Sequence, residues 1–188
     1  MEGLDQDIVR ETLVDRHKFR ILVERYQEAL LRYIRRLGCS DMEAAKDILQ
    51  ESFIKVYVNL NDYDSAYSFS TWLYRIVHNE TMSYFRKQKN RPQAVADESG
   101  LYVFDTLLDE LDVAEEIDST FRSEAVARAL GKLKPQYRDV LVLRFFEEKS
   151  YDEIADILRI PQGTVATCIA RGKADLGHLL TESKIHEL

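Results

Sequence analysis

The stretch from Ser150 to Leu176, SYDEIADILRIPQGTVATCIARGKADL, decides how the second half of this chain folds. Ser150 and Glu153 have the spacing of a capping box, in which the serine oxygen accepts the N3 amide and the carboxylate accepts the N-cap amide. Apolar residues then recur at helical intervals until Pro161 and Gly163, which predict a turn. The same periodicity resumes after the turn. The stretch therefore predicts two helices joined by a short turn.

The second of these helices has two different faces when it is wound at 100° per residue. One stripe is predicted to pack on a core together with Ile154, Ala155 and Leu158 of the preceding helix, and it contains Val165, Ile169, Gly172 and Leu176. The opposite face is predicted to point outward, with Thr164 and Lys173 at its sides, and it contains Thr167, Ala170, Arg171 and Ala174. Gly172 allows close packing, and Cys168 beside the stripe is interpreted as a partly buried, inert thiol.

This pattern is typical of a helix-turn-helix, whose second helix lies in the DNA major groove. Arg171 suits a guanine edge and Thr167 suits a thymine methyl group or a phosphate. Gln162 lies near the helix N-terminus, where free amides suit phosphate. Flanking arginines are expected to neutralise further phosphates, namely Arg138, Arg144 and Arg159. An ordinary helical hairpin remains the alternative, because alanine or cysteine stands at three positions where a DNA reader would carry donors, Ala166, Cys168 and Ala170.

The rest of the chain also predicts helices, and no strand alternation of useful length occurs in it. Helices are predicted over residues 17–37, ended by Gly38, and up to residue 60 from a capping box at Ser40 and Glu43. A third begins near Ser70 and contains TWLYRIVHNETMSYFRK. Two more are predicted in FRSEAVARALGKL and in PQYRDVLVLRFFEE, where Pro135 suits a first helical turn. The fold class is all-α.

The charge of the chain is unevenly distributed. Its net charge is −7 over 188 residues, but residues 93–118 hold 9 acidic residues and no Lys or Arg, which leaves 24 acidic against 26 basic residues elsewhere. The apolar residues within this run suggest that it lies on a surface or in a partner's channel. Two small helical domains, 1–92 and 119–188, are therefore predicted, joined by a flexible acidic linker at 93–118.

Composition excludes several other classes of protein. Cys39 and Cys168 are far apart and the four histidines are scattered, so neither a disulfide framework nor a metal site is expected. The acidic N-terminus is unlike a signal peptide, and no run of about 18 apolar residues could span a bilayer. A cytoplasmic protein is expected. No nucleophile, base and orienting group converge in either block, so an enzyme is not expected and no cofactor is implied.

The third helix carries a face that is poor core material. Leu73, Val77 and Tyr84 are predicted to face a core, whereas the outward stripe contains Trp72, Arg75, Asn79, Ser83 and Arg86. Such a stripe suits nucleic acid, because a ring stacks on an unpaired base and guanidinium groups bind phosphate. The preceding loop NDYDSAYSFS is of a type that can hold a flipped base. The alternative is a half-buried core Trp72, and Glu80 on the core face requires a partner.

Taken together, these residues resemble the bacterial sigma factors of the extracytoplasmic function (ECF) group. EAAKDILQESFIKVYVNLNDYD (43–64) and FSTWLYRIVHNETMSYFRK (69–87) are similar to the family's region 2. LGKLKPQYRDVLVLRFFEEKSYDEIADILRIPQGTVATCIARGKADL (130–176) is similar to region 4. The resemblance implies a subunit that binds core RNA polymerase, directs it to specific promoters and helps to melt them, without catalysing a reaction.

The resemblance also implies sites. Docking on the clamp helices of the β′ subunit would involve Asp47, Gln50, Glu51 and Phe53. The melted non-template strand of the −10 element would contact Asn61, Asp62, Tyr63, Ser68, Phe69, Ser70, Thr71, Trp72, Arg75, Asn79, Ser83 and Arg86. The second domain would pack on the β flap and read the duplex −35 element through Arg144, Ser150, Gln162, Thr164, Thr167, Arg171 and Lys173. The linker would thread toward the RNA exit path, and an anti-sigma factor would hold the protein inactive.

Two other classes stay open at this point. A free-standing helix-turn-helix regulator would bind operators without polymerase, but it needs a dimer interface and a basic net charge, and this chain shows neither clearly. An adaptor with degenerate DNA contacts is the third possibility, and the sparse recognition helix favours it. A recognition helix with few hydrogen-bond donors can still bias promoter choice when two weak DNA-binding domains are held by one RNA polymerase, because tethering raises their effective concentration.

Overall fold

The structure is a computed structural model that describes residues 2–88 and 122–185. Within these ranges the chain is helical and contains no strand, so the predicted all-α fold class is confirmed. The first group of helices comprises α1 (Glu2–Val14), α2 (Phe19–Arg36), α3 (Met42–Val58) and α4 (Phe69–Gln88), with the short η1 (Arg16–Lys18) and η2 (Leu60–Asp62). The second group comprises α6 (Arg122–Lys132), α7 (Pro135–Leu141), the π-helix η5 (Val142–Phe146), α8 (Tyr151–Leu158) and α9 (Gln162–Ile185). The predicted acidic linker lies outside the described residues.

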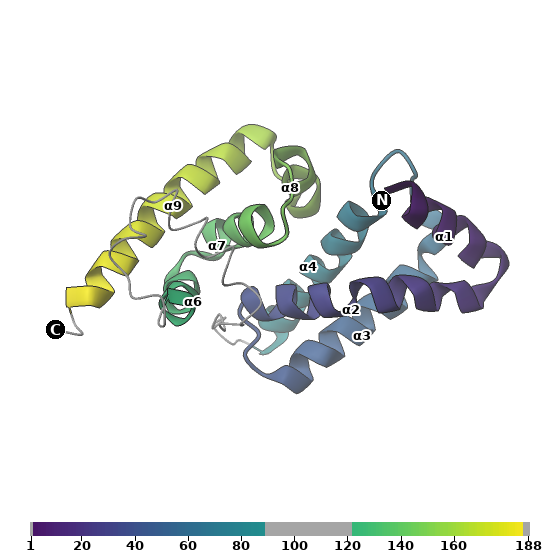
Figure 1. The fold of residues 1–188 in the computed structure, drawn as a ribbon, viewed down its shortest axis with the longest axis horizontal. Helices are drawn as coiled ribbons and strands as arrows, with labels where there is room; N and C mark the ends of the chain where they lie inside the picture. Colours follow the sequence, from purple (N-terminus) through teal and green to yellow (C-terminus); the bar gives the residue numbers. More distant parts are fainter. Residues whose placement is uncertain (1, 89–121, 186–188) are drawn as a thin grey trace.

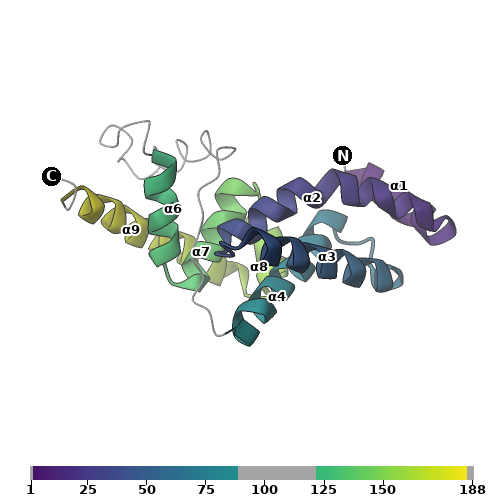
Figure 2. The same ribbon diagram turned by 90° about the horizontal axis from the view of Figure 1, so that it is seen from below.

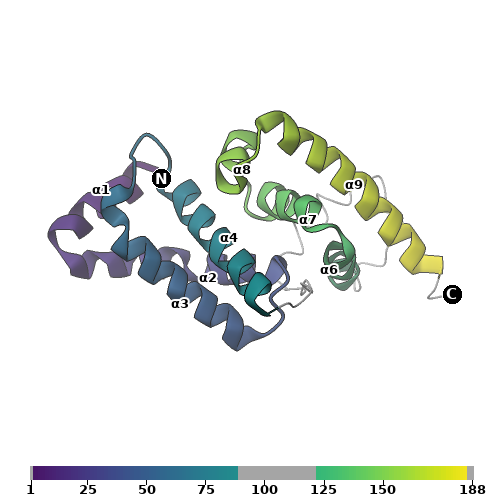
Figure 3. The same cartoon turned by 180° about the vertical axis from the view of Figure 1, so that it is seen from behind.

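The two groups lie side by side, with α7 and α8 on the side of the second group that faces α4 (Figures 1 and 3). Helix α1 and the end of α9 lie at opposite ends of the molecule (Figure 2). In the first group, the core-facing residues of α2 and α4 are fully buried, among them Leu30, Ile34 and Leu73. In the second group, Leu141, Ile154 and Val165 are fully buried where α7, α8 and α9 meet.

Helix α1 is an element that the sequence analysis did not predict. Ile8 and Val9 are buried against the first group of helices. The Asp5 carboxylate is also buried, where it pairs with the guanidinium of Arg25 and accepts a hydrogen bond from the Tyr26 hydroxyl. Burial and the neighbouring carboxylate together raise the pKa of Tyr26 well above its ordinary value. Periodicity did not predict this helix, because a single short apolar stripe within an acidic segment gives a weak signal.

Two of the three predicted helix starts have the expected chemistry. Pro135 lies in the first turn of α7, as predicted. Ser150 caps α8 in a complete capping box, with its Oγ 3.2 Å from the Glu153 amide and the Glu153 carboxylate 2.9 Å from the Ser150 amide. The capping box predicted at Ser40 is wrong. Asp41 caps α3 instead, because its Oδ1 accepts the amide of Glu43 at 2.9 Å, two residues ahead.

Candidate nucleic-acid interface

Helix α9 presents the two faces that its sequence predicts. Val165, Ile169 and Leu176 are buried, and so is Gly172. A Cβ on Gly172 would lie 3.2 Å from Leu141 Cδ1 and 3.2 Å from Tyr137 Cβ, so α9 crosses α7 at a distance that only glycine permits without displacement. The outward side is exposed along Thr164, Ala166, Thr167, Ala170, Arg171 and Ala174, with Gln162 exposed at the N-terminal end and Lys173 half-buried beside the stripe.

The outward side of α9 offers few donors, as expected. The Thr167 hydroxyl donates to the Gly163 carbonyl at 2.9 Å, which leaves its methyl group and its acceptor capacity for a ligand. Arg171 is exposed one turn further on. Cys168 is 8% exposed, in agreement with a buried thiol beside the core stripe. An exposed face with one guanidinium can read a base edge only if other contacts fix its register.

The three flanking arginines differ in their surroundings. Arg144 is exposed, donates to the Lys149 carbonyl at 3.1 Å and lies over the Tyr151 ring. Arg159 is exposed at the end of α8, in the left-handed backbone conformation with φ 55°. The prediction for Arg138 is wrong. Its side chain is 1% exposed and its guanidinium binds Asp139 Oδ1 at 3.0 and 3.1 Å, so it cannot reach phosphate.

Helix α4 presents only part of its predicted outward face. Asn79 and Arg86 are exposed, and Ser83 joins them, since it donates to the Asn79 carbonyl at 2.8 Å and accepts from Arg86 at 2.9 Å. On the opposite side Leu73 and Val77 are buried as predicted, whereas Tyr84 is only half-buried and Phe85 takes the core position.

The outward orientation predicted for Trp72 is wrong for this arrangement of the chain. Its side chain is 9% exposed and packs against the rings of Tyr63 and Phe69, with centroid distances of 5.4 and 5.9 Å. These rings therefore cover the Trp72 indole, whereas the side chain of Asn79 on the same helix is exposed. Glu80, which required a partner, pairs with Lys55 at 2.7 Å.

The loop before α4 is held by local hydrogen bonds. The Tyr63 hydroxyl donates to the Tyr67 carbonyl at 2.7 Å, and Ser68 Oγ accepts the Thr71 amide at 3.1 Å. Asn61 and Asp62 are exposed beside it, whereas Phe69 is buried. A small cavity of about 80 Å³ opens between this loop and α4, lined by Asp62, Asp64, Tyr67, Thr71, Trp72, Arg75 and Asp156. The last of these residues comes from α8.

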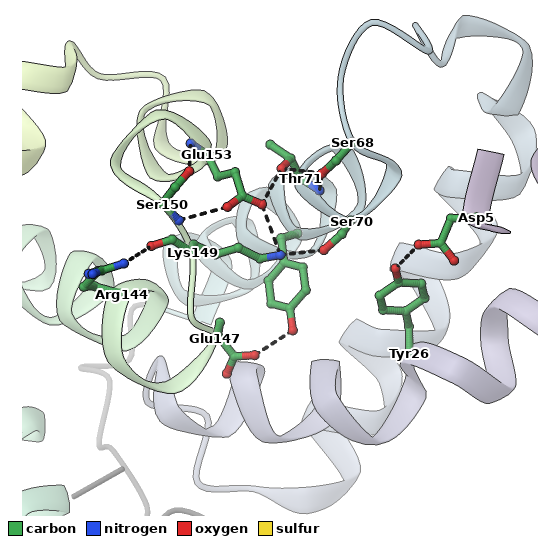
Figure 4. A network of polar contacts seen from close by, with 11 residues as sticks. Asp5, Tyr26, Ser68, Ser70, Thr71, Arg144, Glu147, Lys149, Ser150 and Glu153 are labelled. Atoms are coloured by element: carbon green, nitrogen blue, oxygen red, sulfur yellow. Dashed lines mark hydrogen bonds and ion pairs between the residues drawn. The ribbon is translucent and has the colours of Figure 1, made fainter. Parts of the chain in front are cut away.

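Several residues at the start of α4 contact the second group of helices (Figure 4). The Lys149 ammonium donates to Ser70 Oγ at 2.6 Å, and the Thr71 hydroxyl donates to Glu153 Oε1 at 3.2 Å. Burial alone would raise the pKa of the Glu153 carboxyl, but the Ser150 amide and the Lys149 charge outweigh it and lower that pKa. Glu153 is therefore held as a carboxylate against α4. Sequence reasoning gave no signal for this contact, because it joins residues about 80 positions apart.

A wide apolar groove lies between α2 and α3. Phe19 lines it and packs on Phe53 and Tyr57 at centroid distances of 6.3 and 5.1 Å. The groove has a volume of about 910 Å³ and is lined by Arg16, His17, Phe19, Arg20, Val23, Gln27, Lys46, Leu49, Gln50, Phe53, Ile54 and Tyr57. Two of the four predicted polymerase contacts, Gln50 and Phe53, line it, while Asp47 and Glu51 are exposed on α3 outside it. The α2 and η1 residues that line the groove were not among the predicted contacts.

The described part of the chain holds no group of three or more metal-ligating side chains. Among the described helices, none is long and apolar enough to cross a membrane. Cys39 and Cys168 are free thiols.

Comparison with known proteins agrees with this geometry. Residues 22–91 match the family model of sigma-70 region 2, and residues 123–176 match that of sigma-70 region 4. The chain is 36% identical over 86% of its length to the ECF RNA polymerase sigma factor SigW of Bacillus subtilis, of which it covers 88%. It is 33% identical over 90% of its length to the RNA polymerase sigma-H factor of Pseudomonas aeruginosa, of which it covers 90%.

Solved structures share the fold. CnrH, determined in complex with the cytosolic domain of CnrY, matches with a TM-score of 0.68 at 24% identity, covering 95% of this chain and 97% of that one. The sigma factor RpoE of Bartonella quintana, determined with the anti-sigma factor NepR, matches with a TM-score of 0.63 at 20% identity, covering 87% of this chain and 96% of that one.

An all-α chain with two sigma-70 regions in this order is a transcription initiation factor and not an enzyme. The chain belongs to the ECF sigma factors, which bind RNA polymerase and direct it to promoters.

Proposed function

We propose that this sigma factor reads its promoter with two separate faces, the exposed part of α4 for the melted −10 strand and the outward side of α9 for the −35 duplex. The observation that carries the proposal is the division of α9 into a buried stripe and an exposed stripe that holds Thr164, Thr167 and Arg171. This leaves one continuous helical face free for a major groove, which admits an α-helix.

The face of α4 suits a single strand. Asn79 offers an amide to a base edge, Arg86 offers a guanidinium to phosphate, and Trp72 offers a ring once it is uncovered. The proposal keeps the other residues that the sequence predicts to contact the −10 strand. It also keeps the predicted −35 contacts Arg144, Ser150, Gln162 and Lys173. For Ser150, the capping box uses the backbone amide as a donor and the hydroxyl oxygen as an acceptor, so the hydroxyl hydrogen is the group left to donate to a phosphate.

We propose that the groove between α2 and α3 receives the clamp helices of the polymerase β′ subunit, and that the second domain packs on the β flap. An apolar groove of this size suits an inserted helix. Asp47 and Glu51 would form its polar rim. The domain boundaries 1–92 and 119–188 with a linker at 93–118 are part of the same proposal, as is a cytoplasmic location, where the polymerase works.

We also propose regulation by an anti-sigma factor. Support comes from the solved relatives with the same fold, of which RpoE was crystallised with the anti-sigma factor NepR.

The test is transcription by purified core polymerase from templates selected out of a genomic library. The full chain is expected to give discrete promoter-dependent transcripts. The double variant Asn79→Ala with Arg86→Ala is expected to form fewer open complexes, as measured by potassium permanganate footprinting.

The groove is tested by the variant Ile54→Asp, which is expected to weaken binding to core polymerase by about tenfold or more. Val14→Asp is the matched control, because Val14 is 91% exposed on α1 outside the groove. Equal core affinity of the two variants would refute the assignment of the groove. Tight operator binding without polymerase would favour a free-standing regulator.

A further inference from the structure

Helix α1 lies beside the loop that precedes α4 (Figures 1 and 3). It packs on α2, on α4 and on η2, the short helix from which the loop begins, and its residues Ile8 and Val9 are buried. The first turns of α1 add two polar side chains, Asp5 and Gln6, which reach α2 and the loop. Neither residue is among the predicted DNA contacts. Helix α1 therefore acts on a DNA strand only through the residues that it holds in place.

The Gln6 side chain holds the loop by its backbone. Its Nε2 donates to the Ser65 carbonyl at 3.0 Å, across 59 positions of sequence. Within the loop, the Tyr63 hydroxyl donates to the Tyr67 carbonyl at 2.7 Å. This second bond is local and helps to fix the shape of the loop, whereas the Gln6 bond fixes the position of the loop relative to the helices.

The Asp5 side chain supports the aromatic cluster of the same site. Its buried carboxylate accepts the hydroxyl of Tyr26 on α2 (Figure 4) and pairs with the guanidinium of Arg25. The Tyr26 ring packs on Phe69 with a centroid distance of 6.0 Å, and Phe69 packs on Trp72 at 5.9 Å. Asp5 thus fixes the orientation of a ring on which the cluster around the indole rests.

The contacts of Gln6 and Asp5 differ in what they contribute to stability. Gln6 is half-buried and Ser65 is exposed, so both groups bond to water when they separate, and their mutual hydrogen bond contributes little to the stability of the fold. The bond instead limits the freedom of the loop to move relative to α1. The Asp5 carboxylate is buried, and loss of its partners would leave an unpaired buried charge. Gln6 is thus the residue at which positioning can be measured apart from folding.

The position of the loop sets the shape of the small cavity beside α4. The loop and the end of η2 contribute Tyr67, Asp62 and Asp64 to its lining, and α4 contributes Trp72 and its neighbours. A site that selects one base needs its groups held within about 0.5 Å of the productive geometry. A loop free to shift relative to α4 would still admit a base, but it would discriminate less well between the four bases.

We propose that α1 positions the −10 site: Gln6 holds the loop and Asp5 holds the ring that packs on Phe69, so that the pocket for an extruded base is formed before the strand arrives. The inference rests on the proposed −10 role of the loop and α4. Gln6 is a positioning residue, because it reaches the strand only through the backbone of Ser65. Its loss is expected to relax the choice of base without weakening binding to core polymerase.

The test compares Gln6→Glu with the wild type in the full chain bound to core polymerase. Glutamate has the shape of glutamine, but at neutral pH its carboxylate has no donor for the Ser65 carbonyl. Abortive-initiation rates are measured on promoters that carry each of the four bases at each −10 position. We expect the preference for the best base at one position to fall by about threefold or more, out of the fivefold or larger discrimination that one mismatched base pair ordinarily produces.

Arg10→Ala is the matched control. Arg10 is exposed on the same helix and bonds Asp7 at 3.3 Å, and its removal lowers the net charge by one, as Gln6→Glu does. It should keep the wild-type base preference. Urea denaturation and core binding should match the wild type for both variants. Unchanged base preference in Gln6→Glu would overturn the positioning role, and so would an equal loss of rate on all promoters together with lower stability, which indicates a merely structural effect.

A second variant, Tyr26→Phe, removes the hydroxyl that Asp5 accepts and keeps the ring on Phe69. It should relax the preference at the same −10 position, and circular dichroism verifies that it stays helical. Wild-type selectivity in this variant would remove Asp5 from the proposal.

The −10 assignment itself is tested separately with Tyr67→Ala in the loop and with Asn79→Ala on α4. Relaxed base preference in Tyr67→Ala and in Gln6→Glu at the same position supports both proposals. Relaxed preference in Tyr67→Ala alone overturns the role of α1 and leaves the −10 site standing. Wild-type preference and open-complex formation in Tyr67→Ala and Asn79→Ala alike overturn the −10 site.

Discussion

Gly172 of α9 lies directly against Leu141 of α7, so close that a methyl group on the glycine would be 3.2 Å from the leucine Cδ1. This approach fixes where the outward side of α9 lies relative to the rest of the second domain, because both helices are buried along this line.

Gly172→Val is therefore expected to destabilise the protein by about 1–3 kcal/mol, the usual cost of forcing extra carbon atoms into a packed interface. Urea denaturation followed by circular dichroism measures it. Gly177→Ala is the matched control, since a Cβ there meets nothing within 4 Å. It should stabilise α9 by about 0.5–1 kcal/mol, the ordinary helix advantage of alanine over glycine. Equal effects of the two variants would contradict the close crossing.

The capping residue of α3 gives a second prediction. Asp41→Ala should lower the free energy of unfolding by about 0.5–2 kcal/mol, because the amide of Glu43 loses its acceptor. Ser40→Ala, one residue earlier, should leave stability within about 0.5 kcal/mol of the wild type, as for most surface changes. Thermal or urea unfolding of both variants checks this. The reverse order would restore the capping box expected from the sequence.

The exposed side of α9 gives a third prediction. Arg171→Ala should weaken promoter binding by the holoenzyme by about 1–3 kcal/mol and relax sequence preference at one position of the −35 element. Thr181→Ala is the control, since Thr181 is exposed on the same helix and bonds the Gly177 carbonyl at 2.9 Å as Thr167 bonds that of Gly163. Filter binding with mutated promoters measures both. A similar loss in the two variants would show that the helix does not present Arg171 to the groove.

The buried carboxyl group of Glu147 gives a prediction on pH. Burial raises its pKa above the ordinary 4.5, although the Tyr74 hydroxyl and the Arg36 guanidinium partly oppose the rise. The folded chain thus holds this proton more tightly than the unfolded chain. The contribution to stability is complete below pH 4.5 and is lost as the pH rises through the folded pKa.

Glu147→Gln should reduce the loss of stability as the pH rises from 4.5 through the folded pKa of Glu147. It should leave the loss of stability below pH 4.5, the acid limb of the profile, unchanged. Glu153 contributes to the loss of stability in acid, because its pKa is lowered in the folded chain, so its contribution is present above 4.5 and is lost as the pH falls through the folded pKa. Glu153→Gln should flatten that limb. Urea midpoints across the two pH ranges measure both effects, and a wild-type profile for either variant would contradict its assignment.

Local chemistry explains why much of the second domain could be predicted from sequence. The capping box at Ser150, the first-turn proline of α7 and the buried stripe of α9 each depend on residues within a few positions of one another. The same is true of the exposed stripe with Thr167 and Arg171.

The errors arose where the burial of a side chain, and not its position along a helix, decides what surrounds it. Trp72 was predicted to face outward from its position on α4, but rings of the preceding loop and the helix α8 lie beside it. Arg138 was predicted to be a phosphate contact, but Asp139 pairs with it inside the second domain. Helical periodicity reports which residues share a face, and it does not report what covers that face.

The amino-acid order alone determined that this chain is helical, where most of its helices begin and end, and which side of α9 is polar, because these depend on hydrogen bonds and apolar spacing within one or two turns. Only the tertiary structure decided that α8 docks on α4 and that a groove opens between α2 and α3. Those features join residues tens of positions apart, and their energies come from desolvation and fit between surfaces that exist only after each helix has formed.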